Sequence, residues 1–562
     1  MPARVRQRAQ ARRTGRLPRH VRMMVRMGRR HLPQPLCDVA VERAIVVPAG
    51  DAVPLLTDHY RPLLPGPRPT LLVRTPYGRG FPWDYVYGAL FARQGFHVVI
   101  QSCRGTAGSG GELQPFLNEA ADAHAAVAWL RERDWFNGAL GTVGASYLGH
   151  TQWALATDPP PELLAMVIQV SSEDFYEFLY PKGGAFALEA TLTALTATLT
   201  MERGFGRFLL ATVRLLRHIR RVERTLPFID AYPAAFGRRV GYFEDWLAHP
   251  DRQDPYWAPR RTAVPAELAP PTSLLTGWWD ACLDPTLASY RKLRAAGRDV
   301  RLVVGPWNHA SGFNDDMPTL LGEALSWLGA HLDGDRSSLP RHPVRVHVGR
   351  IGGRGQWRDL ADWPPPDAEH QQWHLHGDGT LDRVPRDNPE VSSFRYDPAD
   401  PTPTAGGPSL NSRAAGPKRN NKIEARDDVL VFTSEPLPAP LEVIGPVSVR
   451  LSARGAGPHF DVFARLCDVD ERGSSWNICD GLVRVADGDR PWHDLTVPMS
   501  ATAHRFHAGH RLRVQISGGA HPRFMRNTGT GEPWATTTRL VAADVEIGHG
   551  PSQPCVLSLP VA

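Results

Sequence analysis

The sequence predicts an α/β unit that is interrupted by a helical insertion and followed by an all-β unit. Short β-branched runs alternate with helical patterns over about residues 37–170 and again over 272–332. The strand signal stops between about 173 and 266, and helical patterns vanish beyond residue 340. Strands that alternate with helices indicate a mainly parallel sheet with helices on both faces. A chain of 562 residues is also too long for one hydrophobic core, so several domains are expected.

The α/β unit falls into two parts, which we assign to residues 35–172 and 267–339. The first part carries strand patterns at 44–47, 70–74, 97–101, 140–143 and 163–170. A helix is predicted over 119–133, where Ala123, Val127 and Leu130 recur at helical spacing. The second part carries strand patterns at 272–276 and 300–304, and helical patterns at 285–296 and 318–332.

The helical insertion is assigned to residues 173–266. Two long helical patterns, 186–201 and 205–222, predict a cap that covers a substrate site.

The all-β unit is assigned to 340–562. Its short strands, which predict an antiparallel sandwich or jelly roll, lie at 344–348, 429–433, 447–453, 461–468, 481–485, 493–497, 511–517 and 538–547.

Charge is unevenly distributed along the chain. The net charge is +6, but residues 1–34 hold eleven arginines and no acidic residue, so the remainder is mildly acidic. We expect 1–34 to be a disordered tail or an upstream extension. The alternative is an arm that binds nucleic acid or an anionic membrane surface. Arginine outnumbers lysine throughout without a pattern of interleaved aromatic residues, so no nucleic-acid partner is expected.

Hydropathy and cysteine content indicate the cellular setting. No run of eighteen apolar residues exists, so no membrane-spanning segment is expected. The six cysteines are few and scattered for a chain of this length, which favours a reducing compartment over a disulfide framework. We therefore expect a cytoplasmic protein.

The segment Gly144-Ala145-Ser146-Tyr147-Leu148-Gly149 is the first candidate for chemistry. It follows a predicted strand and opens a predicted helix, and Ser146 stands between small residues. An α/β-hydrolase presents its nucleophilic serine on such a tight, strained turn. Leu148 occupies the place of the second glycine in G-x-S-x-G, and Gly149 comes one position later. An ordinary glycine-flanked turn is the alternative interpretation.

A serine nucleophile needs a base and a group that orients the base. Asp280 follows the predicted strand 272–276, and His309 follows the predicted strand 300–304. Both loops leave the carboxyl ends of strands, where a parallel sheet gathers its ligands. The alternatives are a helix N-cap for Asp280, with Asp284 as a competing acid, and an exposed loop position for His309.

Further motifs carry a resemblance to a known family. They are Thr75-Pro76-Tyr77, Cys103-Arg104-Gly105 with Ser109-Gly110-Gly111, residues 135–138, the segment 144–149, residues 277–280 and residues 305–309. Together they resemble the cocaine-esterase and X-prolyl dipeptidyl-peptidase group of serine hydrolases. The stretches 463–470 and 504–527 resemble the jelly-roll domain of that group, and the group's G-x-S-Y-x-G turn accounts for the late glycine. Gln101 departs from the group, whose members often carry an acidic residue before the Arg-Gly pair.

The resemblance implies an α/β-hydrolase fold with a helical cap and a C-terminal jelly roll of the galactose-binding-like type. It implies that Ser146 is the nucleophile, His309 the general base and then acid, and Asp280 the residue that orients His309. It also implies an oxyanion hole formed by the hydroxyl of Tyr77 and the backbone N–H of Tyr147. Donors placed where negative charge develops stabilise the transition state.

The expected activity is hydrolysis of a small carboxylic ester or amide through an acyl-serine intermediate, with no cofactor and no metal. One alternative is release of X-Pro dipeptides, for which Glu173, Asp174 and Glu177 would bind the substrate's free amine rather than form a solvated acidic turn. The other is a binding protein that kept the fold without activity. The jelly roll offers a surface for a homo-oligomer.

Overall fold

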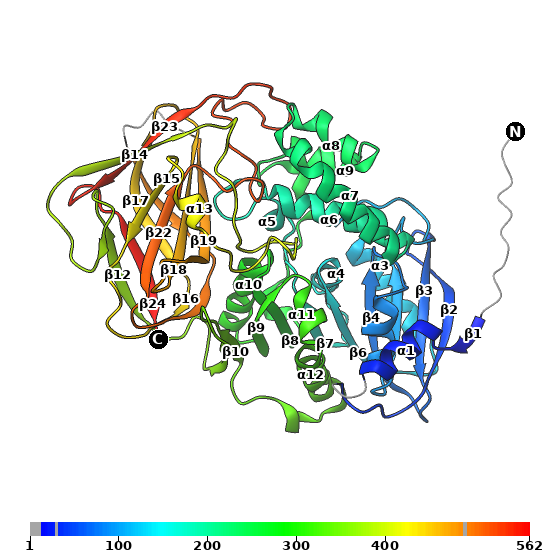
Figure 1. Ribbon diagram of the computed structural model, residues 1–562. Coiled ribbons are helices and arrows are strands. Elements are labelled where there is room, and N and C mark those ends of the chain that lie inside the picture. The colour runs from blue at the N-terminus through cyan, green and yellow to red at the C-terminus, as the bar shows by residue number, and fades with distance from the viewer. Residues whose placement is uncertain (1–12, 29–31, 487–491) are drawn as a thin grey trace, which may run out of the picture.

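The structure is a computed structural model that describes residues 13–28, 32–486 and 492–562. Its centre is an 11-stranded sheet in the order β1-β2-β3-β5-β4-β6-β7-β8-β9-β10-β11 (Figure 1). Neighbouring strands run parallel from β5 to β10, and β1, β2, β3 and β11 extend the two edges antiparallel. The strands are β1 (Arg13–Arg16), β2 (Val39–Pro48), β3 (Pro54–Pro62), β4 (Arg68–Thr75), β5 (His97–Ser102), β6 (Phe136–Ala145), β7 (Leu163–Gln169), β8 (Thr272–Trp279), β9 (Val300–Asn308), β10 (Val344–Val348) and β11 (Gln356–Leu360).

Helices cover both faces of this sheet. On one face the apolar side chains of α3 (Glu119–Arg131) and α10 (Leu283–Ala295) form a cluster with alternate residues of the strands. On the other face lie α2 (Leu90–Ala92) with the preceding turn Asp84–Ala89, and α12 (Met317–Leu328). The short α11 (Ser311–Asp315) follows β9. A sheet buried on both faces matches the continuous apolar runs of its central strands.

Five helices form the cap between β7 and β8. They are α5 (Tyr176–Leu179), α6 (Leu188–Thr200), α7 (Phe205–Arg224), α8 (Phe228–Phe236) and α9 (Gly241–Ala248). Leu192 of α6, Phe228 of α8 and Phe243 of α9 are fully buried and belong to the cluster that also holds α12. The cap therefore shares a hydrophobic core with one face of the sheet.

The C-terminal unit is an antiparallel β-sandwich. One sheet has four strands in the order β15-β22-β18-β19, and the other follows the path β13-β12-β24-β17-β23-β14 with β16, β20 and β21 joined to it. The strands are β12 (Glu369–Leu375), β13 (Leu381–Asp382), β14 (Glu390–Tyr396), β15 (Val429–Thr433), β16 (Leu441–Gly445), β17 (Ser448–Gly455), β18 (Phe460–Val469), β19 (Ser475–Val485), β20 (His493–Pro498), β21 (Thr502–Phe506), β22 (Arg511–Ser517), β23 (Ala543–His549) and β24 (Val556–Val561). A single helical turn, α13 (Asn421–Glu424), stands among them, although none was expected beyond residue 340.

Residues 344–348, which we expected among the strands of the all-β unit, pair with the large sheet. This segment is β10, which pairs parallel with β9 and antiparallel with β11, so the large sheet extends to Leu360. Val344, Val346 and Val348 point into the cluster beneath the large sheet. A five-residue alternating strand carries the same pattern in either sheet, so the sequence could not assign it.

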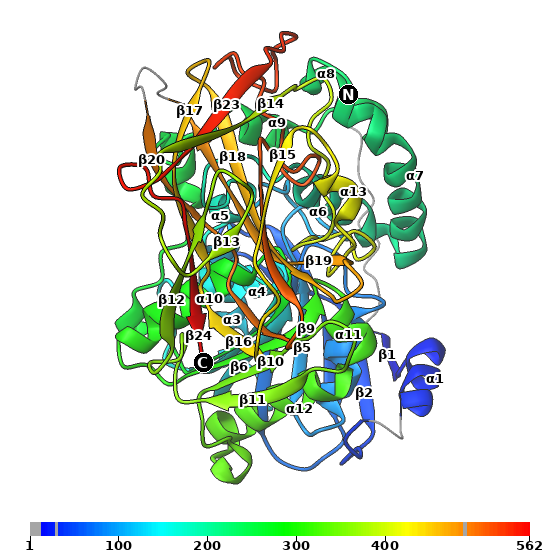
Figure 2. The ribbon, with the colours of Figure 1, turned by 60° about the vertical axis from the view of Figure 1, so that its left-hand side comes forward.

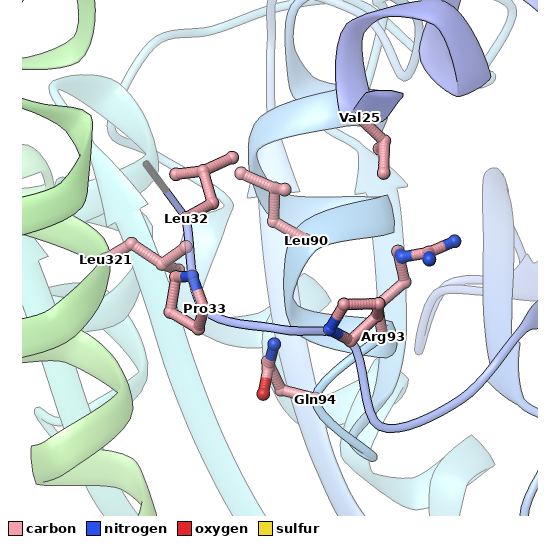
Figure 3. A pocket seen from close by; sticks show the side chains of 8 residues that line it. Val25, Leu32, Pro33, Leu90, Arg93, Gln94 and Leu321 are labelled. Carbon is pink, nitrogen blue, oxygen red and sulfur yellow. The ribbon is translucent and has the colours of Figure 1, made fainter. Parts of the chain in front are cut away.

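The expectation that 1–34 is disordered is wrong for residues 13–28, while 1–12 and 29–31 lie outside the described residues. β1 pairs antiparallel with β2, and α1 (Arg19–Gly28) packs on the turn Asp84–Ala89. Val21 is fully buried, and His20 Nε2 lies at a hydrogen-bond distance of 2.9 Å from Asp84 Oδ2. Val25 and Leu32 face Leu90 across a small apolar hollow (Figure 3). Among all described residues, no helix is long and apolar enough to cross a membrane.

Candidate active site

Ser146 occupies a strained turn between β6 and α4 (Tyr147–Leu155). Its φ is +59° and its ψ is −125°, a backbone conformation that L-residues rarely adopt. Its N–H donates to the carbonyl of Gln169 on the adjacent β7 at 2.9 Å. The turn therefore has the geometry of a hydrolase nucleophile elbow rather than that of an ordinary glycine-flanked turn.

Two glycines make this turn possible because each lies where a side chain has no room. A Cβ at Gly144 would stand 2.5 Å from the Cβ of Leu148, and a Cβ at Gly149 would stand 2.4 Å from the Cβ of Ser171. Gly149, and not Leu148, is the residue that lies against the segment after β7. Leu148 is itself buried. The late glycine in the motif is thus required by the packing of α4.

Tyr77 lies two residues beyond β4 and reaches the same turn. Its backbone N–H donates to Thr75 Oγ1 at 3.0 Å. Burial raises the pKa of Tyr77 to about 12, although the Ser146 side chain and the Tyr147 N–H hydrogen-bond to its hydroxyl and lower the pKa. The phenol is therefore protonated at neutral pH and can donate a hydrogen bond. The Tyr77 hydroxyl therefore lies beside the Ser146 side chain and the Tyr147 N–H.

The side chain of Tyr147 is held beneath the turn. Its hydroxyl donates to Glu119 at 2.9 Å and accepts from the N–H of Phe116 at 3.1 Å. Glu119 in turn forms a 2.7 Å ion pair with Arg74, whose Nε donates to Gln101 at 2.9 Å. These contacts fix the backbone of Tyr147 at the start of α4. Gln101, which departs from the family pattern, takes part in this support and not in the site itself.

Asp280 and His309 form the second part of the site. His309 Nδ1 and Asp280 Oδ1 are 2.9 Å apart. Asp280 is fully buried and also accepts from the N–H of Cys282 at 3.0 Å and from Thr276 Oγ1 at 3.2 Å. Asp284, the competing acid, instead accepts from Ser500 at 3.1 Å, and burial raises its pKa.

The strand order explains how these residues reach one edge. β6, β8 and β9 are parallel strands of one sheet, and Ser146, Asp280 and His309 follow their carboxyl ends.

In the described part of the chain, Asp280, Cys282 and His309 also place three potential ligand atoms within 4.8 Å of one another. Burial raises the pKa of the Cys282 thiol well above its usual range, which keeps it protonated and a poor metal ligand. The donor set fits an Asp–His pair better than a metal centre.

A loop of the C-terminal unit contacts both the large sheet and the cap next to these residues. The sequence alone did not predict these contacts. Ser409 donates its N–H to the carbonyl of Trp279, the residue before Asp280, at 3.2 Å. Its hydroxyl donates to Glu189 of the cap helix α6 at 2.6 Å, and the N–H of Asn411 donates to the same carboxylate at 3.1 Å. Leu410 packs against the cluster shared by the cap and the sheet. Sheet, cap and sandwich therefore all border the site.

The three acidic residues at the cap entrance are paired with cations. Glu173 accepts from Lys292 at 2.7 Å, and Arg252 bridges Asp174 at 2.9 Å and Glu177 at 3.0 Å. No carboxylate of this cluster is left without a cationic partner.

The chain is similar to known hydrolases over nearly its whole length. It is 32% identical to the cocaine esterase of Rhodococcus sp. (strain MB1 Bresler) over 571 residues, which cover 93% of this chain and 98% of that enzyme. Residues 51–311 match the X-Pro dipeptidyl-peptidase (S15 family) model, and residues 340–554 match the X-Pro dipeptidyl-peptidase C-terminal non-catalytic domain. The chain belongs to the family of the cocaine esterase and X-Pro dipeptidyl-peptidases.

Solved structures agree with this assignment at the level of the fold. An aminopeptidase from a marine sediment Thaumarchaeota archaeon has a TM-score of 0.77 at 22% identity, with 94% of this chain and 97% of that chain covered. An α-amino acid ester hydrolase has the same TM-score and identity, with coverages of 94% and 98%. The predicted α/β-hydrolase fold with a C-terminal jelly roll is confirmed, and this member of the cocaine-esterase family is a hydrolase.

The close packing around the Ser146 turn predicts that a methyl group added at Gly149 lowers the stability of the protein. Gly149→Ala should lower the free energy of unfolding by about 1–3 kcal/mol, because the new Cβ overlaps Ser171. Gly322→Ala is the matched control. Gly322 lies in α12, and a Cβ at this position would have no neighbouring atom within 4 Å. Gly322→Ala should be neutral or stabilise by up to about 1 kcal/mol. Urea unfolding of both variants measures the difference, and equal stabilities would contradict the packing argument.

Proposed function

We propose that this chain is a serine esterase that cleaves carboxylic esters through an acyl-Ser146 intermediate. The observation that carries the proposal is the strained turn at Ser146, with the Tyr77 hydroxyl and the Tyr147 N–H beside it. Two preformed donors next to a nucleophile are suited to the tetrahedral oxyanion of acyl transfer. The 2.9 Å contact between His309 and Asp280, at the same edge of the sheet, supplies a base with an oriented ring.

In the proposed reaction Ser146 Oγ attacks the carbonyl carbon of the ester and its proton passes to His309 Nε2. The carbonyl oxygen becomes an oxyanion that the Tyr77 hydroxyl and the Tyr147 N–H stabilise. His309 then gives the proton to the departing alkoxide, which leaves as an alcohol. Water attacks the acyl-serine with His309 as base, and the released products are a carboxylic acid and free Ser146.

Asp280 is assigned the role of orienting His309. Its carboxylate accepts from His309 Nδ1, which leaves Nε2 free to take a proton, and it stabilises the imidazolium that forms. The Cys282 N–H and the Thr276 hydroxyl hold the carboxylate in turn. This arrangement supports Asp280, rather than Asp284, as the acid.

The surroundings of the site favour a neutral ester over a substrate with a free amine. The carboxylates of Glu173, Asp174 and Glu177 are already neutralised by Lys292 and Arg252. Burial raises the pKa of Asp174, which weakens it further as an anion. Leu410 adds apolar surface beside the sheet. Among the relatives, the name of the cocaine esterase points to cleavage of an ester, whereas the name of the archaeal aminopeptidase points to cleavage of a peptide.

Removal of the nucleophile tests the mechanism. Ser146→Ala should abolish hydrolysis of p-nitrophenyl acyl esters and labelling by a fluorophosphonate probe. It should not lower the thermal unfolding temperature, because alanine retains the backbone and loses only one hydroxyl. Ester hydrolysis by Ser146→Ala at an unchanged rate would refute the mechanism, and a wild-type protein that does not react with the probe would point to an inactive binding protein.

The two tyrosines provide a contrast within the oxyanion hole. Tyr77→Phe removes a donor and should lower kcat by about 100- to 1000-fold with little change in KM. Tyr147→Phe loses a phenolic hydroxyl that supports the turn from beneath but retains the backbone N–H, so its kcat should fall less than that of Tyr77→Phe. Steady-state kinetics with p-nitrophenyl acetate compare them, and equal losses would mean that the Tyr77 hydroxyl is not an oxyanion donor.

Substrate choice distinguishes the esterase from a dipeptidyl-peptidase. We expect hydrolysis of p-nitrophenyl acyl esters and little release of p-nitroaniline from a Gly-Pro anilide. Asp174→Asn should leave kcat/KM for the esters within about threefold, since the paired carboxylate takes no part in ester binding. If the wild type cleaved the Gly-Pro anilide efficiently and Asp174→Asn cleaved it more slowly, the acidic residues would instead form a site for the substrate's amine.

A further inference from the structure

The cap helix α7 exposes apolar side chains on the side that faces away from the protein. Leu209, Leu210 and Val213 are 50%, 73% and 48% exposed. The opposite side of the same helix buries Leu215 and Val222 in the cluster shared with the sheet. The exposed side chains are therefore not needed to attach α7 to the cap.

The exposed side of α7 is also strongly basic. Arg207, Arg214, Arg217 and Arg221 are exposed, and none of them forms an ion pair within the described residues. The single acidic residue in the sequence of α7, Glu223, is buried. Arginines without partners beside exposed leucines give the face an uncompensated positive charge and an apolar centre.

Helix α1 repeats this combination. Arg19, Arg22, Met23, Arg26 and Met27 recur at helical spacing and are all exposed, with Met23 at 58% and Met27 at 70%. No acidic residue occurs in α1. The opposite side attaches the helix to the core through the buried Val21 and through Val25 (Figure 3).

The two helices are linked through one aromatic residue and lie on the same edge of the molecule. The ring of Phe81 lies 6.2 Å from that of His20 in α1 and 5.3 Å from that of Phe205, the first residue of α7. Figure 2 shows both helices on the same right-hand edge of the molecule. We refer to the exposed residues of α1 and α7 named above as the arginine–leucine face.

We propose that the arginine–leucine face binds an anionic lipid surface. Guanidinium groups attract the negative headgroups, and the leucine and methionine side chains enter the boundary between headgroups and acyl chains. The exposed apolar side chains would gain nothing on the phosphates of a nucleic acid. A second copy of the same face would bring two sets of unpaired arginines together, so the charge also disfavours a symmetric dimer there.

The face adjoins the candidate active site. The turn Met201–Arg203 directly precedes α7, and Glu202 in it accepts from the N–H of Ala107 at 2.9 Å. A Cβ at Gly78, the neighbour of Tyr77, would lie 3.3 Å from the Cα of Glu202. Lipid bound to the start of α7 would thus lie close to the loop that carries Tyr77. The binding proposal itself does not depend on the proposed esterase activity.

Vesicle sedimentation with the full chain tests the proposal. At low ionic strength the protein should sediment with vesicles of phosphatidylcholine mixed with phosphatidylglycerol, and not with vesicles of phosphatidylcholine alone. Two double variants, Arg214→Glu with Arg217→Glu and Leu210→Glu with Val213→Glu, should each weaken binding at least about tenfold. If charge reversal prevents folding, Arg214→Gln with Arg217→Gln is the milder substitute and should weaken binding in the same direction.

The control is a double variant in another part of the surface, Leu268→Glu with Arg291→Glu. Leu268 is 54% exposed and Arg291 is an exposed residue of α10, which lies on the other side of the molecule from α7 in Figure 2. This variant should bind like wild type. The proposal would be overturned by no binding to the anionic vesicles, by equal binding of all variants, or by a dimer that Leu210→Glu with Val213→Glu converts to monomers. The proposal would also be overturned if the protein bound duplex DNA and not vesicles, and if only the arginine variant weakened that binding. Such a result would indicate a site for polyanions.

Discussion

The positive φ of Ser146 is possible because two neighbouring positions have no side chain. Gly144 lets Leu148 pack directly beneath the turn, and Gly149 lets α4 approach Ser171 after β7. The hydrogen bond from the Ser146 N–H to Gln169 then joins the turn to the sheet. The direction of α4 follows from this turn, and with it the position of the Tyr147 N–H. One local constraint therefore places both the candidate nucleophile and one candidate oxyanion donor.

Buried charges beneath the elbow keep this arrangement rigid. Arg74 is paired with Glu119 at 2.7 Å and Arg104 with Asp122 at 2.6 Å, and Glu119 also accepts from the Tyr147 hydroxyl. Buried charges are costly unless each finds a partner, so a network in which every member is paired allows few alternative arrangements. Arg104 belongs to the Cys-Arg-Gly motif that contributes to the family resemblance. Through Arg104, that motif takes part in the network beneath the site.

Local sequence was sufficient to predict the central strands, the elbow and the residues after β8 and β9, because each depends on neighbouring residues. It was insufficient where the outcome depends on distant partners. Val344, Val346 and Val348 alternate as they would in either sheet, and only the edge of β9 decides where they pair. The arginines of 13–28 suggested disorder, yet the buried Val21 and the hydrogen bond between His20 and Asp84 hold this segment on the core. Only the resemblance to the family suggested Tyr77 as an oxyanion donor, because its position after a strand does not by itself indicate that role.

The role of the loop around Ser409 could not be predicted, because its partners lie far away in the sequence. Glu189 is a buried carboxylate of the cap that has no cationic partner among the described residues within ion-pair distance. Burial raises its pKa, and the Ser409 hydroxyl, the Asn411 N–H and the Thr193 hydroxyl donate to it and offset its desolvation. Without the loop, the carboxylate would lose the donors from Ser409 and Asn411, which is unfavourable for a buried group. The C-terminal unit therefore stabilises the cap in this position, and the same loop contacts Trp279 beside Asp280. On this physical ground, the sandwich is a structural part of the site even though it contributes no candidate catalytic residue.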